Sequence, residues 1–461
     1  MHHVTTPHRC KSLWLSLVTV SCLGLFAAQS AHAQQYIDDS RDATEEDAGF
    51  DEAYDVRDIK REPDDVTFTP VADRSHPEFE AKGMIVGKFL VFPEMEIGSN
   101  YTDNLYATEK NTESDFFATF KPSVFIRKLK GRHELSLDTF AKAFRFFDHT
   151  SENKTDYGAD FKGTSEIKHD WKLFYGLKYD ISHLDRTDNL SRVFTEEPQE
   201  MREGRAEVGM GYKPNRLGVA GTVRHIDKEY EDGQSLNNPG LTVVRSDGNF
   251  QTDEFETEIS YDFPVNHTAF ASVTLGRTKY DDPIFNDGAG TYTNTFRDSK
   301  NMRGLVGIRS NYKGIIISDI GIGAESVNYE DNAIQDVTNM AVDASVDWNV
   351  TKLTTLGLDL TRQVVQDNDI VTGITQTRGE VSLDHELRRD VVLKSFVSYL
   401  NRQYEEINRE DDVYRIGLGF LYRPSPYLNL AGDVLHSTQS STFAGNDFDQ
   451  NVFMLRLIGK Y

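Results

Sequence analysis

The feature that most constrains this chain is an alternation of apolar and polar residues that begins at Gly83 and continues to the last residue. In the window 254–263, the odd positions are apolar or threonine and the even positions are glutamate, serine or aspartate. The windows 340–348, 356–361 and 414–422 repeat this alternation. A period of two places neighbouring side chains on opposite faces of an extended strand. Residues 83–461 are therefore predicted to be all-β.

The apolar faces of these strands need a partner other than helices. Residues 83–461 lack the period of amphipathic helices, and no window after Ala28 is apolar enough to be a membrane-spanning helix. Lipid can cover the apolar faces if the sheet closes on itself. The stretch from Tyr414 to Tyr422 spans about 27 Å, or roughly 20 Å after a tilt of about 40°, close to the apolar height of a transmembrane barrel. We expect a closed, antiparallel, up-and-down transmembrane β-barrel.

The connections between strands support this expectation, because tight turns alternate with longer polar loops. Eighteen strands are expected, with sixteen as the alternative, near 90–106, 115–129, 132–148, 154–169, 171–184, 200–213, 216–230, 252–263, 267–280, 300–313, 315–329, 336–349, 353–366, 374–387, 391–404, 411–423, 427–438 and 448–461. The largest loops fall at 185–199, 231–251 and 281–298. Short turns on one rim and long loops on the other are typical of a bacterial outer-membrane barrel with a periplasmic short rim. An even number of strands puts both ends of the barrel on that rim.

The first 33 residues read as a cleaved secretory signal. A weakly basic start precedes an apolar run from Leu13 to Ala28, and Ala31 and Ala33 form an A-x-A cleavage pattern. Both cysteines, Cys10 and Cys22, lie inside this segment. The mature chain is therefore expected to have neither disulfides nor thiolate metal ligands.

Residues 34–82 differ from both neighbours. The stretch 34–80 holds sixteen acidic residues against five basic ones and shows no sustained period. This composition predicts a disordered acidic periplasmic segment. It is interpreted either as a solvated leader ahead of the barrel or as a contact segment for a basic partner.

The chain ends on Tyr461, preceded on the same face by Gly459, Leu457, Leu455 and Phe453. This pattern resembles the terminal strand by which bacterial barrels are recognised for insertion. It implies contact with the barrel-assembly machinery and residence in outer-membrane lipid.

The opening of the barrel carries a more specific resemblance. The stretch 83–98, then Tyr101-Thr102-Asp103-Asn104-Leu105-Tyr106, the Lys121-Pro122-Ser123-Val124 run and the Arg132-His133-Glu134-Leu135 run followed by 144–147 resemble the family known as putative β-barrel porin 2. The resemblance extends from about residue 83 to the C terminus. It implies an outer-membrane barrel often associated with export of exopolysaccharide or capsule, and it supplies no catalytic residues. Asp103 and Asn104 are interpreted as a structural turn, or alternatively as a solute or calcium contact.

Sequence motifs for chemistry are absent. The nine histidines after the signal are all more than ten residues apart, and no G-x-S-x-G elbow or phosphate loop occurs. We therefore predict no cofactor, no metal, no nucleic-acid partner and no enzymatic activity.

The polar strand faces are the functional candidates, because they would line the lumen. The acidic candidates are Glu254, Glu256, Glu258, Asp262, Asp319, Glu325, Asp343, Asp347, Asp359, Glu380 and Asp384, and the basic candidates are Lys142, Lys172, Lys178, Arg303, Arg309, Arg415 and Arg456. Opposed charges on facing walls would orient water and admit polar solutes such as sugars. Phe140, Phe144 and Phe174 are candidates for stacking on sugar rings, or for packing within the barrel. Tyr414, Tyr422, Trp348 and Tyr461 are the candidate aromatic girdle.

These features lead to three hypotheses of function. The first is a conduit for exopolysaccharide or capsular polysaccharide, working with periplasmic and inner-membrane export proteins. The second is a general diffusion porin for small polar solutes. The third is a plugged, surface-binding barrel that acts through the loops 185–199, 231–251 and 281–298.

Overall fold

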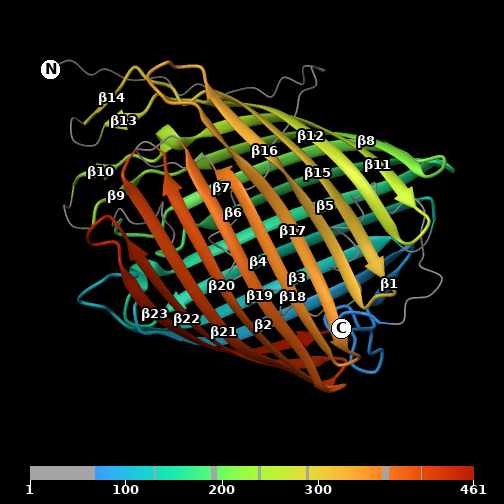
Figure 1. Cartoon of the computed structure of the whole chain (residues 1–461). Helices are drawn as coiled ribbons and strands as arrows, with labels where there is room; N and C mark the ends of the chain where they lie inside the picture. Colours follow the sequence, from blue (N-terminus) through green and yellow to red (C-terminus); the bar gives the residue numbers. More distant parts are fainter. Residues whose placement is uncertain are drawn as a thin grey trace.

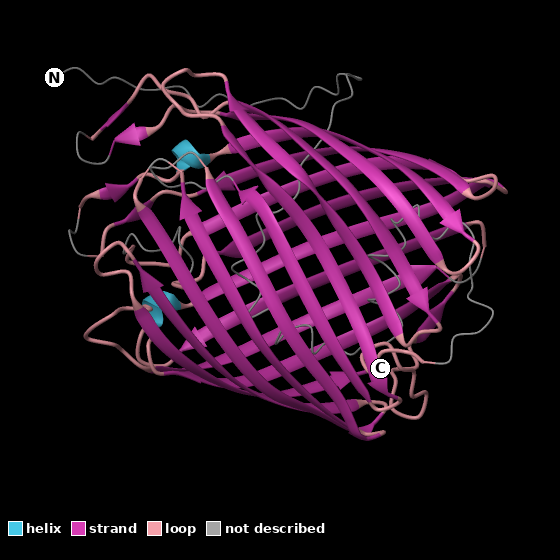
Figure 2. Ribbon diagram, viewed as in Figure 1, coloured by secondary structure: helices cyan, strands magenta, loops and turns pink. Residues whose placement is uncertain are grey.

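Eighteen long antiparallel strands form one closed barrel (Figures 1 and 2). The computed structural model describes residues 68–128, 131–187, 195–236, 240–286, 290–365, 373–405 and 407–461. The barrel strands are β2 (Phe89–Thr102), β3 (Asp115–Lys128), β4 (His133–Phe146), β5 (Lys154–Lys168), β6 (Trp171–His183), β7 (Glu200–Tyr212), β8 (Leu217–Tyr230), β11 (Phe250–Phe263), β12 (His267–Tyr280), β15 (Ser299–Tyr312), β16 (Ile316–Tyr329), β17 (Val337–Thr351), β18 (Thr354–Val365), β19 (Ile374–Arg388), β20 (Val391–Tyr404), β21 (Arg409–Ser425), β22 (Leu428–Ser441) and β23 (Phe448–Lys460). All eighteen expected strands are confirmed.

The ring closes by pairing its first and last strands. β2 pairs antiparallel with β23 in a register that runs from Glu94 opposite Lys460 to Thr102 opposite Val452. Each remaining strand lies beside its neighbour in sequence, and β8 and β11 are joined through the Asp262 N–H, which donates to the Arg216 carbonyl at 2.8 Å. The strands tilt strongly across the barrel axis (Figure 2). A closed, tilted sheet leaves no strand edge unpaired within the membrane.

The outer surface is apolar because, on each strand, every second side chain faces outward and most of these side chains are apolar. On β21, Tyr414, Ile416, Leu418 and Phe420 are all exposed, and Leu418 is 61% exposed. Aromatic pairs mark two levels of this surface: Tyr101 with Phe116 toward the long loops, and Trp171 stacked on Tyr212 at 4.4 Å toward the short turns. This distribution matches an apolar band bounded by aromatic residues.

The two rims differ in the way the sequence predicts. Tight turns join strands at one rim, and at 313–314 the turn uses Lys313 and Gly314, which both have positive φ. Such φ values suit the primed turns that hairpins prefer. The opposite rim carries the longer loops, with the short hairpins β9 (Gly233–Gln234) with β10 (Thr242–Val243) and β13 (Phe285–Asn286) with β14 (Thr291–Tyr292), and with the 3-10 turns η3 (Thr150–Glu152) and η5 (Ser246–Gly248).

The barrel begins and ends at the short rim. A small strand, β1 (Met84–Val86), folds back on the start of β2, and the Tyr461 N–H donates to the Pro93 carbonyl at 3.2 Å. The first described residues, in blue, lie at the same rim as the C terminus (Figure 1). Within the described ranges, none of the helical turns is long and apolar enough to cross a membrane. The signal segment 1–33 with Ala31 and Ala33, and most of the acidic segment, lie outside the described residues.

Candidate functional site

The candidate site is the inner face of the barrel, which alternation separates cleanly from the lipid-facing side. On β11, Phe255, Ile259 and Tyr261 are exposed on the outer surface, whereas Glu254 on the opposite face is only 2% exposed. The same alternation places the other charged candidates inward: Glu256, Glu258, Asp262, Asp319, Glu325, Asp343, Asp347, Asp359, Glu380 and Asp384, and Lys142, Lys172, Lys178, Arg303, Arg309, Arg415 and Arg456. Their role in transport stays a prediction.

Many charges on the inner wall are paired with charges on the same or a nearby strand rather than separated onto facing walls. Arg309 of β15 binds Glu258 of β11 at 2.6 Å and Asp319 of β16 at 2.9 Å. It reaches β11 across β12, and its guanidinium lies 3.8 Å from the centre of the Phe270 ring. Since adjacent strands are only about 4.8 Å apart, a long arginine side chain spans an intervening strand. The expected opposition of charge therefore does not hold for this part of the wall.

The pairing continues around several strands. Arg224 of β8 bridges Glu207 of β7 at 2.9 Å and Glu254 of β11 at 3.0 Å. Further inner pairs are Lys178 with Asp180, Lys213 with Asp262, and Arg456 with Asp433 and Glu96. These paired charges keep the wall polar while they limit its net field, because each acid of a pair lies close to a cation.

One stretch of the wall is more acidic. Asp347 of β17 lies near Asp359 of β18 and Asp384 of β19, and Asp73 of the segment before the barrel lies near Asp347 and Asp384. Among the described residues, no group of three or more histidine, cysteine, aspartate or glutamate side chains has the geometry of a metal site. This acidic stretch therefore contributes negative charge to the wall without forming a metal site among the described residues.

Two of the three expected stacking aromatics are covered. Phe144 and Phe174 are each 2% exposed. The ammonium groups of Lys142 and Lys154 both lie 5.0 Å from the centre of the Phe144 ring, and the Phe174 ring packs over Gly209, where an added Cβ would lie 2.6 Å from it. These two rings pack within the barrel, whereas Phe140 keeps partial exposure.

The Asp103 and Asn104 turn is structural. Asp103 accepts hydrogen bonds from the backbone N–H and the side-chain amide of Asn451 at 2.7 and 2.6 Å. Asn104 donates to the Thr108 and Asp449 carbonyls and accepts from the Thr108 N–H. Both side chains are used in closing the first loop against β23, in agreement with the turn interpretation.

The segment 68–82, which the sequence assigns to the acidic arm, contacts the inner face at the short rim. Val71 is 3% exposed and packs on Val392, Leu421 and Ala431, and its N–H donates to Thr355 Oγ1 at 2.9 Å. We call residues 68–82 the strap. The strap crosses the inner surfaces of β18 to β22, so that part of the arm is folded against the barrel.

Ion pairs hold the strap to the rim. Arg74 binds Glu386 of β19 at 2.5 Å, and His76 Nε2 lies 3.3 Å from the same carboxylate. Farther along, Glu78 lies 3.6 Å from Arg389 of the adjacent turn. Burial and the neighbouring carboxylate of Asp384 raise the pKa of Asp73, because both disfavour its charged form.

At the opposite rim, the loop after β6 folds into the lumen. Leu184 packs on Tyr230, Phe250 and Tyr280, which point inward from β8, β11 and β12. Arg186, 7% exposed, donates to the Glu152 carboxylate through Nε at 3.0 Å and Nη2 at 2.6 Å. A bidentate pair of this kind fixes the loop against the turn that follows β4.

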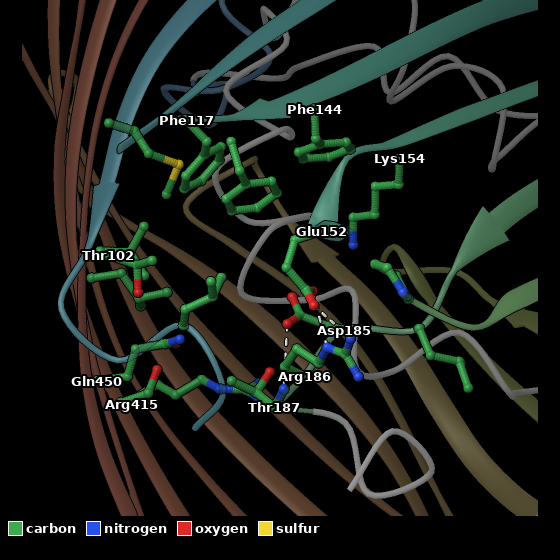
Figure 3. A pocket seen from close by; sticks show the side chains of 18 residues that line it. Thr102, Phe117, Phe144, Glu152, Lys154, Asp185, Arg186, Thr187, Arg415 and Gln450 are labelled. Carbon is green, nitrogen blue, oxygen red and sulfur yellow. Dashed lines mark hydrogen bonds and ion pairs between the residues drawn. The ribbon is translucent and has the colours of Figure 1, made fainter. Parts of the chain in front are cut away.

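The folded loop leaves an open chamber between itself and the wall (Figure 3). The empty space between the loop and the wall is about 850 Å³, a figure that includes the open solvent at its mouth. Its lining combines aromatic, charged and amide side chains from β2 to β5, the folded loop and β21 to β23, among them Phe117, Phe144, Phe146, Glu152, Lys154, Arg186, Arg415 and Gln450. Such a lining offers hydrogen-bond donors and acceptors to a polar solute at the long-loop end of the lumen.

His149 anchors the adjoining loop. Its two ring nitrogens lie 3.0 Å from Asp115 Oδ2 and 2.6 Å from Glu113 Oε2. Burial lowers the His149 pKa, but the bonds to the two carboxylates outweigh burial and raise it overall. Tyr106 lies edge-on to the His149 ring and beneath the Arg186 guanidinium, which links both loops.

The candidate girdle residues lie on the outer surface. Tyr414 is exposed toward the long loops, and Tyr422, Trp348 and Tyr461 are exposed toward the short turns. Their contact with the lipid interface stays a prediction.

The family model described as "Putative beta-barrel porin 2" matches residues 76–461. Curated proteins gave no match.

Solved structures gave distant likenesses. OccK1 (OpdK) of Pseudomonas aeruginosa is 12% identical, covers 80% of this chain and 99% of its own, and has a TM-score of 0.46. OccAB4 of Acinetobacter baumannii is 10% identical over 80% of this chain and 98% of its own, with a TM-score of 0.45. A mutant of the ferric enterobactin receptor PfeA of Pseudomonas aeruginosa is 8% identical over 83% and 82%, with a TM-score of 0.43.

Proposed function

The chain belongs to the family described as Putative beta-barrel porin 2, and on that premise we propose that this outer-membrane β-barrel is a conduit for exopolysaccharide or capsular polysaccharide. The paired inner wall is the observation that carries the proposal. In the Arg309–Glu258 and Arg224–Glu254 pairs, donors and acceptors are present without strong net charge. A hydroxyl-rich chain could exchange hydrogen bonds along such a wall without being held at one point.

Size supports the same proposal. Barrels of 16 to 18 strands are wide enough for an aqueous channel. The strap and the loop after β6 narrow the two ends, and both are held by ion pairs that can be released, Arg74 with Glu386 and Arg186 with Glu152. In the proposal, periplasmic and inner-membrane export proteins supply direction, and the barrel-assembly machinery inserts the chain through its C-terminal strand.

The proposal assigns no catalytic role to the lumen. Several of its carboxylates are engaged by neighbouring cations, as Glu258 is by Arg309 and Asp433 is by Arg456. A carboxylate fixed in this way is poorly placed to act as a general acid or base.

A general diffusion porin is the second candidate, favoured by the mixed charged and amide lining of the chamber. Deleting the gene decides between the two candidates. Loss of surface polysaccharide, restored by the wild-type gene, supports the conduit, and normal surface polysaccharide overturns it. Planar-bilayer conductance with uptake limited by solute size would then favour the porin.

A surface-binding barrel is the third candidate, and the narrowing of both ends of the lumen favours it. Trimming the loops 185–199, 231–251 and 281–298 tests it. Lost binding of a surface partner with intact transport would support this candidate.

A further inference from the structure

Exposed cations recur along the short rim of the barrel. They are Arg132 in the turn between β3 and β4, Lys168 at the end of β5, Arg216 between β7 and β8, Lys313 between β15 and β16, and Lys352 between β17 and β18. We call these five residues the rim cations. They stand in a chain whose formal net charge is −24, so their gathering at one rim runs against the overall composition.

The rim cations lie just beyond the aromatic residues of the outer surface. Lys313 directly follows the exposed Tyr312, whereas Arg216 and Lys352 each come four positions after the exposed Tyr212 and Trp348. These cations lie in the turns, just beyond the strand ends that carry the aromatic residues. Aromatic side chains favour the boundary between lipid tails and headgroups, so cations just beyond them lie toward the lipid phosphates.

The rim cations also differ from the cations of the lumen in their partners. Within the described parts of the chain, no ion pair engages any of the five. Inner-wall cations such as Arg309, Arg224 and Arg456 are each bound by two carboxylates. The rim therefore presents positive charge that the protein itself leaves available.

From this arrangement we propose that the short rim binds the headgroups of anionic phospholipids in the periplasmic leaflet. The rim cations extend from the turn after β3 to the turn after β17, an arc of ten of the eighteen strands, or a little more than half of the ring. A compact protein partner would cover only a short part of this arc, whereas lipid lies against all of it. Each cation close to an anionic surface adds about fivefold to binding, and several act together.

Tryptophan fluorescence can report this binding at the rim itself. Apart from Trp14 in the signal segment, the tryptophans are Trp171, three positions after Lys168, and Trp348, four positions before Lys352. Acyl-brominated lipid quenches tryptophan only at short range. In vesicles of phosphatidylethanolamine with phosphatidylglycerol, quenching by brominated phosphatidylglycerol against brominated phosphatidylethanolamine therefore measures which lipid occupies this rim.

The test compares the full-length barrel with two charge-matched variants. The rim variant carries Arg132→Gln, Lys168→Gln, Arg216→Gln, Lys313→Gln and Lys352→Gln. The control carries Lys110→Gln, Arg202→Gln, Arg277→Gln, Lys279→Gln and Lys300→Gln near the long loops. Retarded migration on heating in detergent gels confirms that each barrel is folded.

We expect the wild type and the control to prefer phosphatidylglycerol at least fivefold, and the rim variant to show a preference near one. Equal quenching by both lipids in the wild type, or an undiminished preference in the rim variant, overturns the proposal. So does a preference that emerges only after removal of residues 34–67, since the acidic segment would then be the occupant of the rim.

Discussion

The strap can be released by removing one charge from its anchor, Glu386. Arg74 and His76 both lie against this carboxylate, whose side chain is 6% exposed, while that of Arg74 is 21% exposed. Glu386→Gln keeps the shape and removes the charge. A hydrogen bond to a charged group contributes about 1.5–3 kcal/mol, and Arg74 recovers part of this from water, so the expected loss is about 1.5–2 kcal/mol. The undocked population should rise roughly 10- to 30-fold.

Cysteine labelling measures that population. Val71 is buried under the docked strap, and the mature chain expected from residue 34 has no cysteine, so Val71→Cys introduces a single thiol whose access to maleimide requires undocking. Cys10 and Cys22 are replaced by serine so that no leader thiol contributes. We compare labelling rates of Val71→Cys with and without Glu386→Gln.

A second lumen carboxylate provides the matched control. Glu258→Gln also removes an acid paired with an arginine, but on β11, away from the strap. Its labelling rate should equal that of Val71→Cys alone. If Glu386→Gln leaves the rate unchanged, or if the thiol reacts at once in both proteins, the strap is not held as described.

Three further predictions follow from other contacts. Arg186→Ala removes both hydrogen bonds to Glu152 and should increase the conductance in planar bilayers and admit larger polyethylene glycols, and Arg186→Lys should give an intermediate result. An unchanged size limit for the polyethylene glycols would contradict the anchoring of the loop by this pair. Docking of the strap raises the pKa of Asp73 above its usual 3.8, so docking is most stable below pH 3.8 and weakens as the pH rises through the raised pKa. Asp73→Asn should remove this pH dependence from the labelling rate of Val71→Cys. An exposed thiol at Lys82→Cys corrects for the pH dependence of the labelling reaction itself. Gly209→Val forces a side chain into the Phe174 ring and should destabilise the barrel by about 1–3 kcal/mol in heat-unfolding gels, whereas Gly221→Val on β8 has ordinary contacts and should cost little.

The strands were predictable because the period of two is enforced along the whole chain. Lipid and water lie on opposite faces of each strand, so the alternation from Tyr414 to Tyr422 is enough to predict which side chains face outward. Strand boundaries followed from turn residues such as Pro214-Asn215 and Gly314. The inward direction of Glu254 and Glu258 came from the same periodicity.

The partners of those inward charges were not predictable from periodicity alone. The Arg309 bond to Glu258 crosses an intervening strand, and its existence depends on the register of three strands at once. Burial of Phe144 likewise depends on Lys154 from the next strand. The sequence of one strand predicts which side chains face the lumen. A contact between side chains of different strands also depends on the register of those strands relative to one another.

Docking of the strap could not be predicted from its acidic composition. The strap is held by the apolar side chain of Val71 and by Arg74 and His76, which both contact Glu386. Asp73 moreover docks beside other acids, which acidic composition argues against. The Arg186–Glu152 anchor joins residues 34 positions apart in aperiodic loops, and no local signal marks it.

The seam between β2 and β23 has a kinetic consequence. Neighbouring hairpins can form as soon as both strands are available, whereas the partner of Glu94 is Lys460, almost at the other end of the chain. Closing so long a loop costs conformational entropy before any contact is gained, and topologies rich in distant contacts fold slowly. Until the last strand arrives, two bare edges can pair with another chain. The half-made protein must therefore be kept apart from its copies in transit, and a chain shortened by its final strand should aggregate rather than insert.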